Sequence, residues 1–181
     1  MQNELMMKRL IILFVMGILL CLGAHAQPNN EVKDYNTGLG LRLGGYTSGF
    51  TVKGFINSKG ALEGIAGFGI RSFVVTGLYE HHFPITGVSG LNLYTGGGAH
   101  IGFFGHRSAY LFHRNKKNGN VVYFVEDGAT AVIPGIDFIF GIEYKFQGAP
   151  FTIGADLKPF ADFYDGVSGY ADGALNLRYV F

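Results

Sequence analysis

Apolar and polar residues alternate along one long stretch of this chain. In residues 132–146, "VIPGIDFIFGIEYKF", every even-numbered position is apolar or aromatic, whereas Asp137, Glu143 and Lys145 occupy odd-numbered positions. Successive side chains of a β-strand point to opposite faces, so this pattern creates one apolar face and one charged face. A helix with the same sequence would spread the charges over its whole surface. The stretch therefore predicts a two-faced β-strand.

The same alternation recurs along the chain and predicts eight strands. These strands are expected at residues 36–45, 48–56, 61–71, 73–83, 91–105, 131–146, 151–163 and 169–181. The connection at 71–72 is the shortest and the connection at 106–130 the longest, with turn-forming sequences between several other strands. We expect an all-β, eight-stranded, antiparallel up-and-down barrel. Pro134 and Pro159, which donate no backbone hydrogen bond, are expected near the strand ends that lie away from the chain termini.

The N-terminal segment is typical of a secretory signal peptide. Lys8 and Arg9 precede an apolar run at residues 10–22, and Ala24 and Ala26 form a small-residue cleavage site. An apolar run of 13 residues is short for a membrane-spanning helix, which needs about 20. We therefore expect a cleaved signal peptide at residues 1–26, a flexible tail at residues 27–35, and one barrel domain at residues 36–181.

Cleavage of the signal peptide would leave a neutral chain without cysteine. The full chain has 14 Lys and Arg and 13 Asp and Glu, and the signal contains Lys8, Arg9 and Glu4, so 12 of each sign remain. Neutrality argues against nucleic acid as a partner. Cys21, the only cysteine, lies within the signal, which excludes a disulfide or a thiolate metal site in the remaining chain. We expect no cofactor.

The orientation of the two faces decides between a membrane barrel and a soluble one. Eight strands enclose an interior that side chains alone fill, and the bulky apolar row would overfill it. The charged row is rich in glycine and fits a narrow interior, so we expect the apolar row to face lipid. The aromatic residues of that row are expected to gather in one belt at the end of the barrel that holds the termini: Tyr79, Phe83, Tyr144, Phe146, Phe151, Tyr179 and Phe181. The opposite orientation would describe a secreted soluble binder.

The chain ends on "GALNLRYVF", in which Leu175, Leu177, Tyr179 and Phe181 alternate with other residues. This segment resembles the C-terminal assembly signal of bacterial outer-membrane β-barrels, and the chain after residue 26 resembles the small eight-stranded OmpA/OmpX-type, porin-like barrels. The resemblance implies a location in the outer membrane of a Gram-negative bacterium. It also implies contact with outer-membrane lipid, lipopolysaccharide and the barrel-assembly machinery. The absence of Trp departs from the usual aromatic girdles of that family.

Charged residues on the inward face are expected to form a polar network. The proposed members are Arg42, Glu80, His82, His100, Asp137, Glu143, Lys145, Asp156, Lys158 and Arg178. The whole inward face carries seven acids and six Lys or Arg, a balance that suits mutually neutralising ion pairs; a small conducting pore is the alternative. Glu80, His82 and His100 all point inward and are candidates for a metal site, but we favour hydrogen-bonded residues and predict no metal.

The connection at 106–130 is the most basic surface segment. Arg107, Arg114, Lys116 and Lys117 outnumber its acids. It is interpreted either as a contact surface for polyanionic lipopolysaccharide or a cell-surface protein, or as a solvated loop without a partner. A lipid-modifying enzyme is a further alternative, but no serine has a histidine at an obvious partnered position on the same face. We expect a structural or surface-interaction role and no enzymatic activity.

Overall fold

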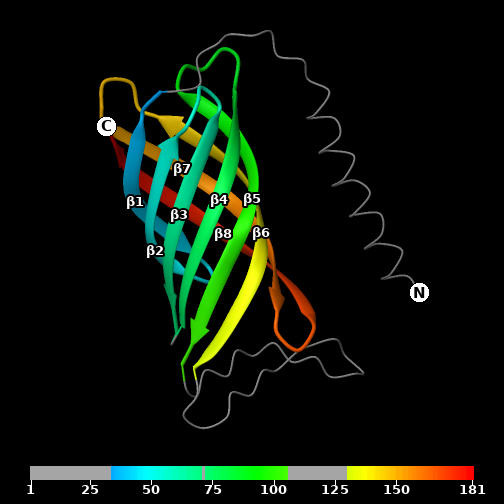
Figure 1. The fold of residues 1–181 in the computed structure, drawn as a ribbon. Coiled ribbons are helices and arrows are strands. Elements are labelled where there is room, and N and C mark those ends of the chain that lie inside the picture. Colours follow the sequence, from blue (N-terminus) through cyan, green and yellow to red (C-terminus); the bar gives the residue numbers. More distant parts are fainter. Residues whose placement is uncertain (1–33, 71, 106–129) are drawn as a thin grey trace, which may run out of the picture. The chain divides into compact units, whose positions relative to one another are not determined.

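The computed structural model describes residues 34–70, 72–105 and 130–181, and eight β-strands run through them (Figure 1). The strands are β1 (Thr37–Gly44), β2 (Ser48–Phe55), β3 (Gly60–Gly69), β4 (Ser72–Pro84), β5 (Leu91–Phe104), β6 (Ala131–Lys145), β7 (Phe151–Phe163) and β8 (Val167–Val180). Every predicted strand is present, and each predicted boundary lies within two residues of the observed one. The alternation in the sequence therefore predicted both the number and the positions of the strands.

The eight strands form one closed sheet. Each strand pairs antiparallel with its neighbours in sequence, and β1 pairs with β8 to complete the wall. Leu41 on β1, for example, is paired with Phe50 on β2 and with Leu177 on β8. Figure 1 shows consecutive strands side by side around a common axis. This closed order confirms the predicted eight-stranded antiparallel barrel. A closed sheet has no edge strand, which is the form that transmembrane barrels require.

The two faces of the wall differ sharply in exposure. On β8 the side chain of Leu177 is 52% exposed whereas that of Arg178 is 1% exposed. On β6 the corresponding values are 55% for Phe138 and 1% for Asp137. Large apolar side chains therefore cover the outside of the barrel, and charged side chains point inward. This orientation is the one predicted for a barrel in lipid and the reverse of a soluble barrel.

Outward-facing aromatic residues form two bands, one at each end of the barrel. The end that holds Tyr35 and Phe181 is called the terminal end, and the opposite end is called the loop end. The terminal-end band contains the residues predicted for it, with the rings of Phe151 and Tyr179 5.5 Å apart. A second band at the loop end joins Phe50, Phe68, Phe73 and Phe103, with successive ring centroids 6.5, 5.1 and 6.2 Å apart.

The expectation of a single aromatic belt was therefore wrong. The residues of the loop-end band lie at the far ends of β2 to β5, where the sequence had suggested only alternating apolar positions. Their grouping depends on the register between neighbouring strands, in which Phe68 is paired with Phe73 and Phe73 with Phe103. Aromatic bands at both ends are typical of the two interfaces of a bilayer.

The N-terminal boundary of the barrel differs from the expected one. Tyr35, assigned to the flexible tail, is buried, and its ring packs edge-on against Phe55 with the ring centroids 5.0 Å apart. Backbone N–H groups of Asn36 and Thr37 donate to the carbonyl of Phe181, which ties the start of β1 to Phe181. The predicted signal peptide and residues 27–33 lie outside the described residues. In the described ranges, no helix has the length and apolarity needed to cross a membrane.

The position of Pro159 also differs from the expected one. The pairs Asp137–Phe160 and Phe140–Leu157 place Pro159 opposite Phe138. Phe138 is the middle residue of β6, which runs from Ala131 to Lys145. Pro159 therefore faces the middle of β6, although it is the fifth residue from the loop end of β7. Pro134, in contrast, lies near the loop end of β6, as predicted.

Candidate functional site

Five charged side chains from five strands meet in the half of the interior near the terminal end. They are Lys53 (β2), Glu63 (β3), Glu80 (β4), Glu143 (β6) and Arg178 (β8), and this group is called the terminal-side cluster. The Arg178 guanidinium donates to Glu143 Oε2 at 2.6 Å and to Glu63 Oε1 at 2.5 Å. Lys53 Nζ lies 2.7 Å from Glu80 Oε2 and 3.3 Å from Glu63 Oε2. All five residues are at most 3% exposed, so these ion pairs are shielded from solvent.

Neutral groups surround the terminal-side cluster and satisfy part of its hydrogen-bonding capacity. Tyr35 donates its hydroxyl to Glu143 Oε1 at 2.7 Å, and Thr51 donates to Glu63. Burial, with the nearby Glu143 carboxylate, raises the pKa of the Tyr35 phenol well above its ordinary value, so the phenol stays a neutral donor. Lys53 Nζ also lies 4.1 Å from the centroid of the Tyr94 ring, a favourable cation–π distance.

Apolar side chains lie on both sides of the terminal-side cluster. Toward the terminal end, a buried group closes around Tyr35 and Phe55 together with Ala61 and Val180. Toward the loop end, a second buried group contains Ile65, Leu78, Tyr94 and Ile139. Gly141 makes room for this second group, because a Cβ at that position would collide with the Tyr94 ring.

Arg42 organises a second cluster nearer the loop end. Its guanidinium donates to Asp156 Oδ1 at 2.7 Å and to Asp172 Oδ2 at 2.8 Å, which joins β1 to β7 and β8. Asn176 donates to the other oxygen of Asp156 at 2.6 Å, and the Tyr46 backbone N–H donates to Asp172 Oδ1 at 2.9 Å. Both carboxylates are therefore held from several directions.

His100 organises a third cluster, which joins β5, β6 and β7. Its Nδ1 lies 2.7 Å from Asp137 Oδ2 and its Nε2 lies 3.0 Å from Asp162 Oδ1. Lys158 on β7 pairs with the other oxygen of Asp137 on β6. A Cβ at Gly135 would collide with the His100 ring, so glycine at this position lets the imidazole lie against the inner wall of β6.

Three aromatic rings pack together at the loop end of the interior. The Phe160 ring lies 5.8 Å from Tyr46 and 5.5 Å from Tyr170, and Tyr46 and Tyr170 are 6.2 Å apart. Phe160 also contacts His100 edge-on at 5.6 Å and lies under Lys158 Nζ at 4.8 Å. These rings therefore pack against the third charged cluster through Phe160.

The structure brings together most of the predicted network residues but divides them among separate clusters. Lys145 is an exception: it is half-buried at the terminal end, where its ammonium donates to the carbonyls of Phe146 at 2.9 Å and Ala149 at 2.8 Å. Its assignment to the interior network was wrong, because the inward-facing row continues past the end of the enclosed space. The structure also adds residues that the site prediction left out, all on the inward face: Lys53, Glu63, Asp162, Asp172 and Asn176.

The charge balance of the interior also differs from the expected one. Seven buried carboxylates remain, but among the described residues only Arg42, Lys53, Lys158 and Arg178 are buried Lys or Arg. Position 71 is not described, and Lys145 lies at the barrel end. The two buried histidines, His82 and His100, both contact carboxylates and complete the set of basic groups.

The proposed meeting of Glu80, His82 and His100 does not occur. His82 Nε2 lies 3.2 Å from Glu80 Oε2 in the terminal-side cluster, whereas His100 is bound to Asp137 and Asp162. Within the described part of the chain, no group of three or more His, Asp or Glu is arranged to hold a metal ion.

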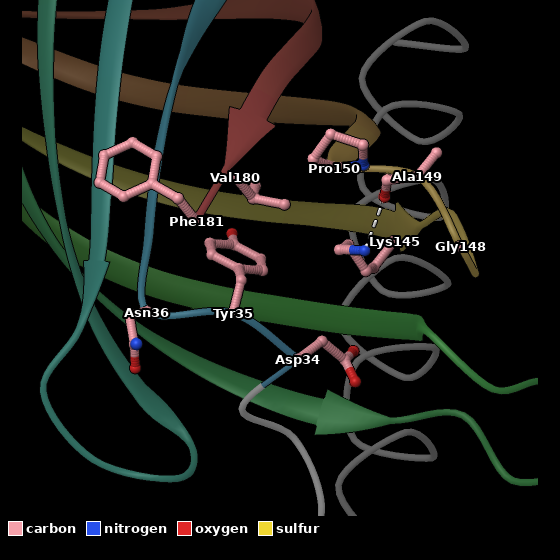
Figure 2. Close-up of a pocket in the computed structure, with 9 residues that line it drawn as sticks. All are labelled: Asp34, Tyr35, Asn36, Lys145, Gly148, Ala149, Pro150, Val180 and Phe181. Atoms are coloured by element: carbon pink, nitrogen blue, oxygen red, sulfur yellow. Dashed lines mark hydrogen bonds between the residues drawn. The ribbon is translucent and has the colours of Figure 1, made fainter.

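A shallow cavity of about 630 Å³ lies at the terminal end, outside the enclosed interior. It is bounded by Asp34, Tyr35 and Asn36 before β1, by the turn between β6 and β7, and by Phe181. Figure 2 shows Lys145 and Ala149 joined by a hydrogen bond at one side of this cavity, with Tyr35 and Val180 beside each other. The predicted loop residues Arg107, Arg114, Lys116 and Lys117 lie outside the described residues.

Comparisons with known proteins support the fold. No family model and no curated protein matches the chain. Among solved structures, it is similar to the N-terminal β-barrel domain of Pseudomonas aeruginosa OprF, with a TM-score of 0.57 and 14% sequence identity. The match covers 80% of this chain and 96% of that chain. The closed wall, its outward apolar rows and this likeness identify the chain's fold as a small eight-stranded outer-membrane-type β-barrel.

Proposed function

We propose that this chain is an integral outer-membrane β-barrel of a Gram-negative bacterium, with an interior plugged by side chains and a structural or surface-interaction role. The observation that carries the proposal is the position of Arg178, which bonds acids on β3 and β6 at once from β8. A side chain that joins separate parts of the wall occupies the space that a channel would need. The likeness to the OprF domain supports the fold and the membrane environment.

The layering of the interior supports a plug over a pore. The group around Tyr35 and Phe55, the terminal-side cluster and the group around Ile65 and Ile139 follow one another along the interior. The rings of Tyr46, Phe160 and Tyr170 pack together in the loop-end half of the barrel. Eight-stranded barrels have an interior that side chains can fill completely.

Conductance measurements test the plug. Purified protein that migrates faster without boiling than after boiling is reconstituted into planar bilayers. We expect no discrete channel steps, because the buried ion pairs leave no continuous aqueous path. Stepwise currents that depend on the presence of the folded barrel would contradict the plug and support a small pore. An unchanged migration on boiling would contradict the membrane-barrel assignment itself.

The terminal strand supports a partnership with the barrel-assembly machinery. Leu175, Leu177, Tyr179 and Phe181 all face outward and are between 50% and 60% exposed. Alternate side chains on one face of a terminal strand can occupy pockets of a protein that binds the strand by β-augmentation. These residues form the proposed assembly signal, and their outward row continues into contact with lipid.

We expect Phe181→Ala to lower the yield of folded barrel in outer membranes several-fold, because the last aromatic anchor of the signal is removed. The yield is measured as the heat-modifiable fraction on gels. Phe151→Ala is the matched control: Phe151 belongs to the same aromatic band and contacts Tyr179, but it lies outside the terminal strand. Equal yields for the two variants would argue against a special role of the C-terminal residue.

The proposed surface contact rests on the basic loop between β5 and β6. Arg107, Arg114, Lys116 and Lys117 provide charges that suit the phosphates of lipopolysaccharide or an acidic cell-surface protein. Deletion of residues 110–125 is expected to reduce adhesion of cells, or binding of purified lipopolysaccharide, without lowering the heat-modifiable fraction. Binding that is unchanged by the deletion would contradict the surface contact, and only the structural role would remain.

A further inference from the structure

The ladder between β6 and β7 is the one interrupted ladder in the described wall. Its pairs run from Gly135–Asp162 to Asp137–Phe160 and resume at Phe140–Leu157. The other seven ladders continue without a gap from their first to their last pair. The missing positions are Phe138 and Ile139 on β6, opposite Pro159 and Lys158 on β7.

Proline explains the interruption. Pro159 has no N–H, so it cannot donate to β6 at the position where Phe138 faces it. The site lies deep in the apolar band, because Phe138 is six residues from Val132, next to the loop-end aromatic band, and six from Tyr144, in the terminal-end band. A backbone acceptor left without a donor is especially costly in hydrocarbon, where water cannot replace the missing partner.

Side chains bridge the same two strands on the inner side of the interruption. Lys158 on β7 pairs with Asp137 on β6, and His100 links Asp137 to Asp162 at 2.7 and 3.0 Å. Asp137 directly precedes the interrupted positions on β6, and Lys158 is itself one of them on β7. This clamp of Lys158, Asp137, His100 and Asp162 replaces part of the cohesion that the backbone lacks.

We propose that the seam between β6 and β7 at Pro159 is the place where the barrel wall opens laterally toward the lipid, and that the clamp holds it shut. Opening at this point exposes the charged residues behind the seam to the membrane, while the rest of the wall stays paired. The proposal concerns a movement of the wall and does not depend on which role the barrel has at the cell surface.

Amide hydrogen exchange, followed residue by residue by NMR in detergent micelles, tests the seam. We expect the amides of residues 137–140, 157, 158 and 160 to exchange at least tenfold faster than those at 77–80 and 96–99, which lie at the same depth in the uninterrupted ladder of β4 and β5. Pro159→Ala restores the missing donor and is expected to slow exchange at the seam to the rate of the β4–β5 residues. Equal rates in the unmodified protein, or no slowing in Pro159→Ala, would overturn the proposal.

Two control variants test whether the changes in exchange are specific to the seam or arise from any substitution of a proline or a lysine. Pro84→Ala should leave exchange at the seam unchanged, because Pro84 lies at the terminal end of β4, in an uninterrupted ladder with β5. Lys158→Met should accelerate exchange at the seam several-fold, whereas Lys145→Met, at the barrel end of β6, should not. Slowing at the seam in Pro84→Ala would show that the missing donor of Pro159 does not control opening. No acceleration in Lys158→Met would show the same of the clamp.

Discussion

Replacing Arg178 with methionine is expected to lower the free energy of unfolding by about 3–5 kcal/mol, the usual cost of removing one partner from a buried ion pair. Arg178 donates to Glu143 and Glu63 at 2.6 and 2.5 Å. Without the guanidinium, Lys53 alone faces three buried carboxylates in the terminal-side cluster. Urea unfolding in lipid vesicles, followed by the heat-modifiable fraction on gels, measures the loss.

A double-mutant cycle shows whether the loss comes from uncompensated charge. Arg178→Met combined with Glu143→Gln removes one charge of each sign, and we expect it to recover part of the stability lost in Arg178→Met. A loss below about 1 kcal/mol for Arg178→Met would mean that water screens these charges, as in an exposed ion pair. That result would argue against a plugged interior and would support the alternative of a small conducting pore.

Introducing arginine on the outer face at mid-depth is the second large expected effect. Ile136 on β6 points outward and is 43% exposed. An arginine facing the centre of a bilayer costs about 2–4 kcal/mol, and near the interfaces the cost falls to about 0–1 kcal/mol. We therefore expect Ile136→Arg to destabilise the barrel in vesicles by about 2–4 kcal/mol in urea unfolding experiments.

Val167→Arg is the matched control for this prediction. Val167 begins β8 beside the turn from β7, is 65% exposed, and lies at the loop end of the wall. Its substitution is expected to cost about 0–1 kcal/mol, because the guanidinium reaches the interface. If Ile136→Arg cost no more than Val167→Arg, the outer face would not lie in hydrocarbon, and a soluble secreted barrel would become the better interpretation.

The interior shows where sequence reasoning succeeded and where it stopped. Arg42, Asp137 and Arg178 could each be assigned to the inward face, because a strand alternates its side chains with a period of two. The partners could not be assigned, since Arg178 bonds Glu63, 115 positions away, and Arg42 bonds Asp172, 130 positions away. Which inward residues lie at the same height depends on the register of every intervening ladder.

The errors have the same physical origin. Lys145 continues the inward row, but only the structure shows that the enclosed space ends before it and that its ammonium reaches the carbonyl of Ala149. The loop-end aromatic band was missed because Phe50, Phe68 and Phe103 are neighbours only across strands. Tyr35 was assigned to the tail because it precedes the alternating region, and nothing in its local sequence indicates its bond to Glu143.

The sequence by itself determined the number of strands, their boundaries and which face of each points outward, since these follow from local alternation and from the volume that eight strands enclose. Only the tertiary structure decided which charges pair, where the second aromatic band lies, and that Pro159 interrupts the wall opposite Phe138. The reason is that strand register and barrel closure act between segments far apart in the chain. Alternation along a single strand carries no information about either.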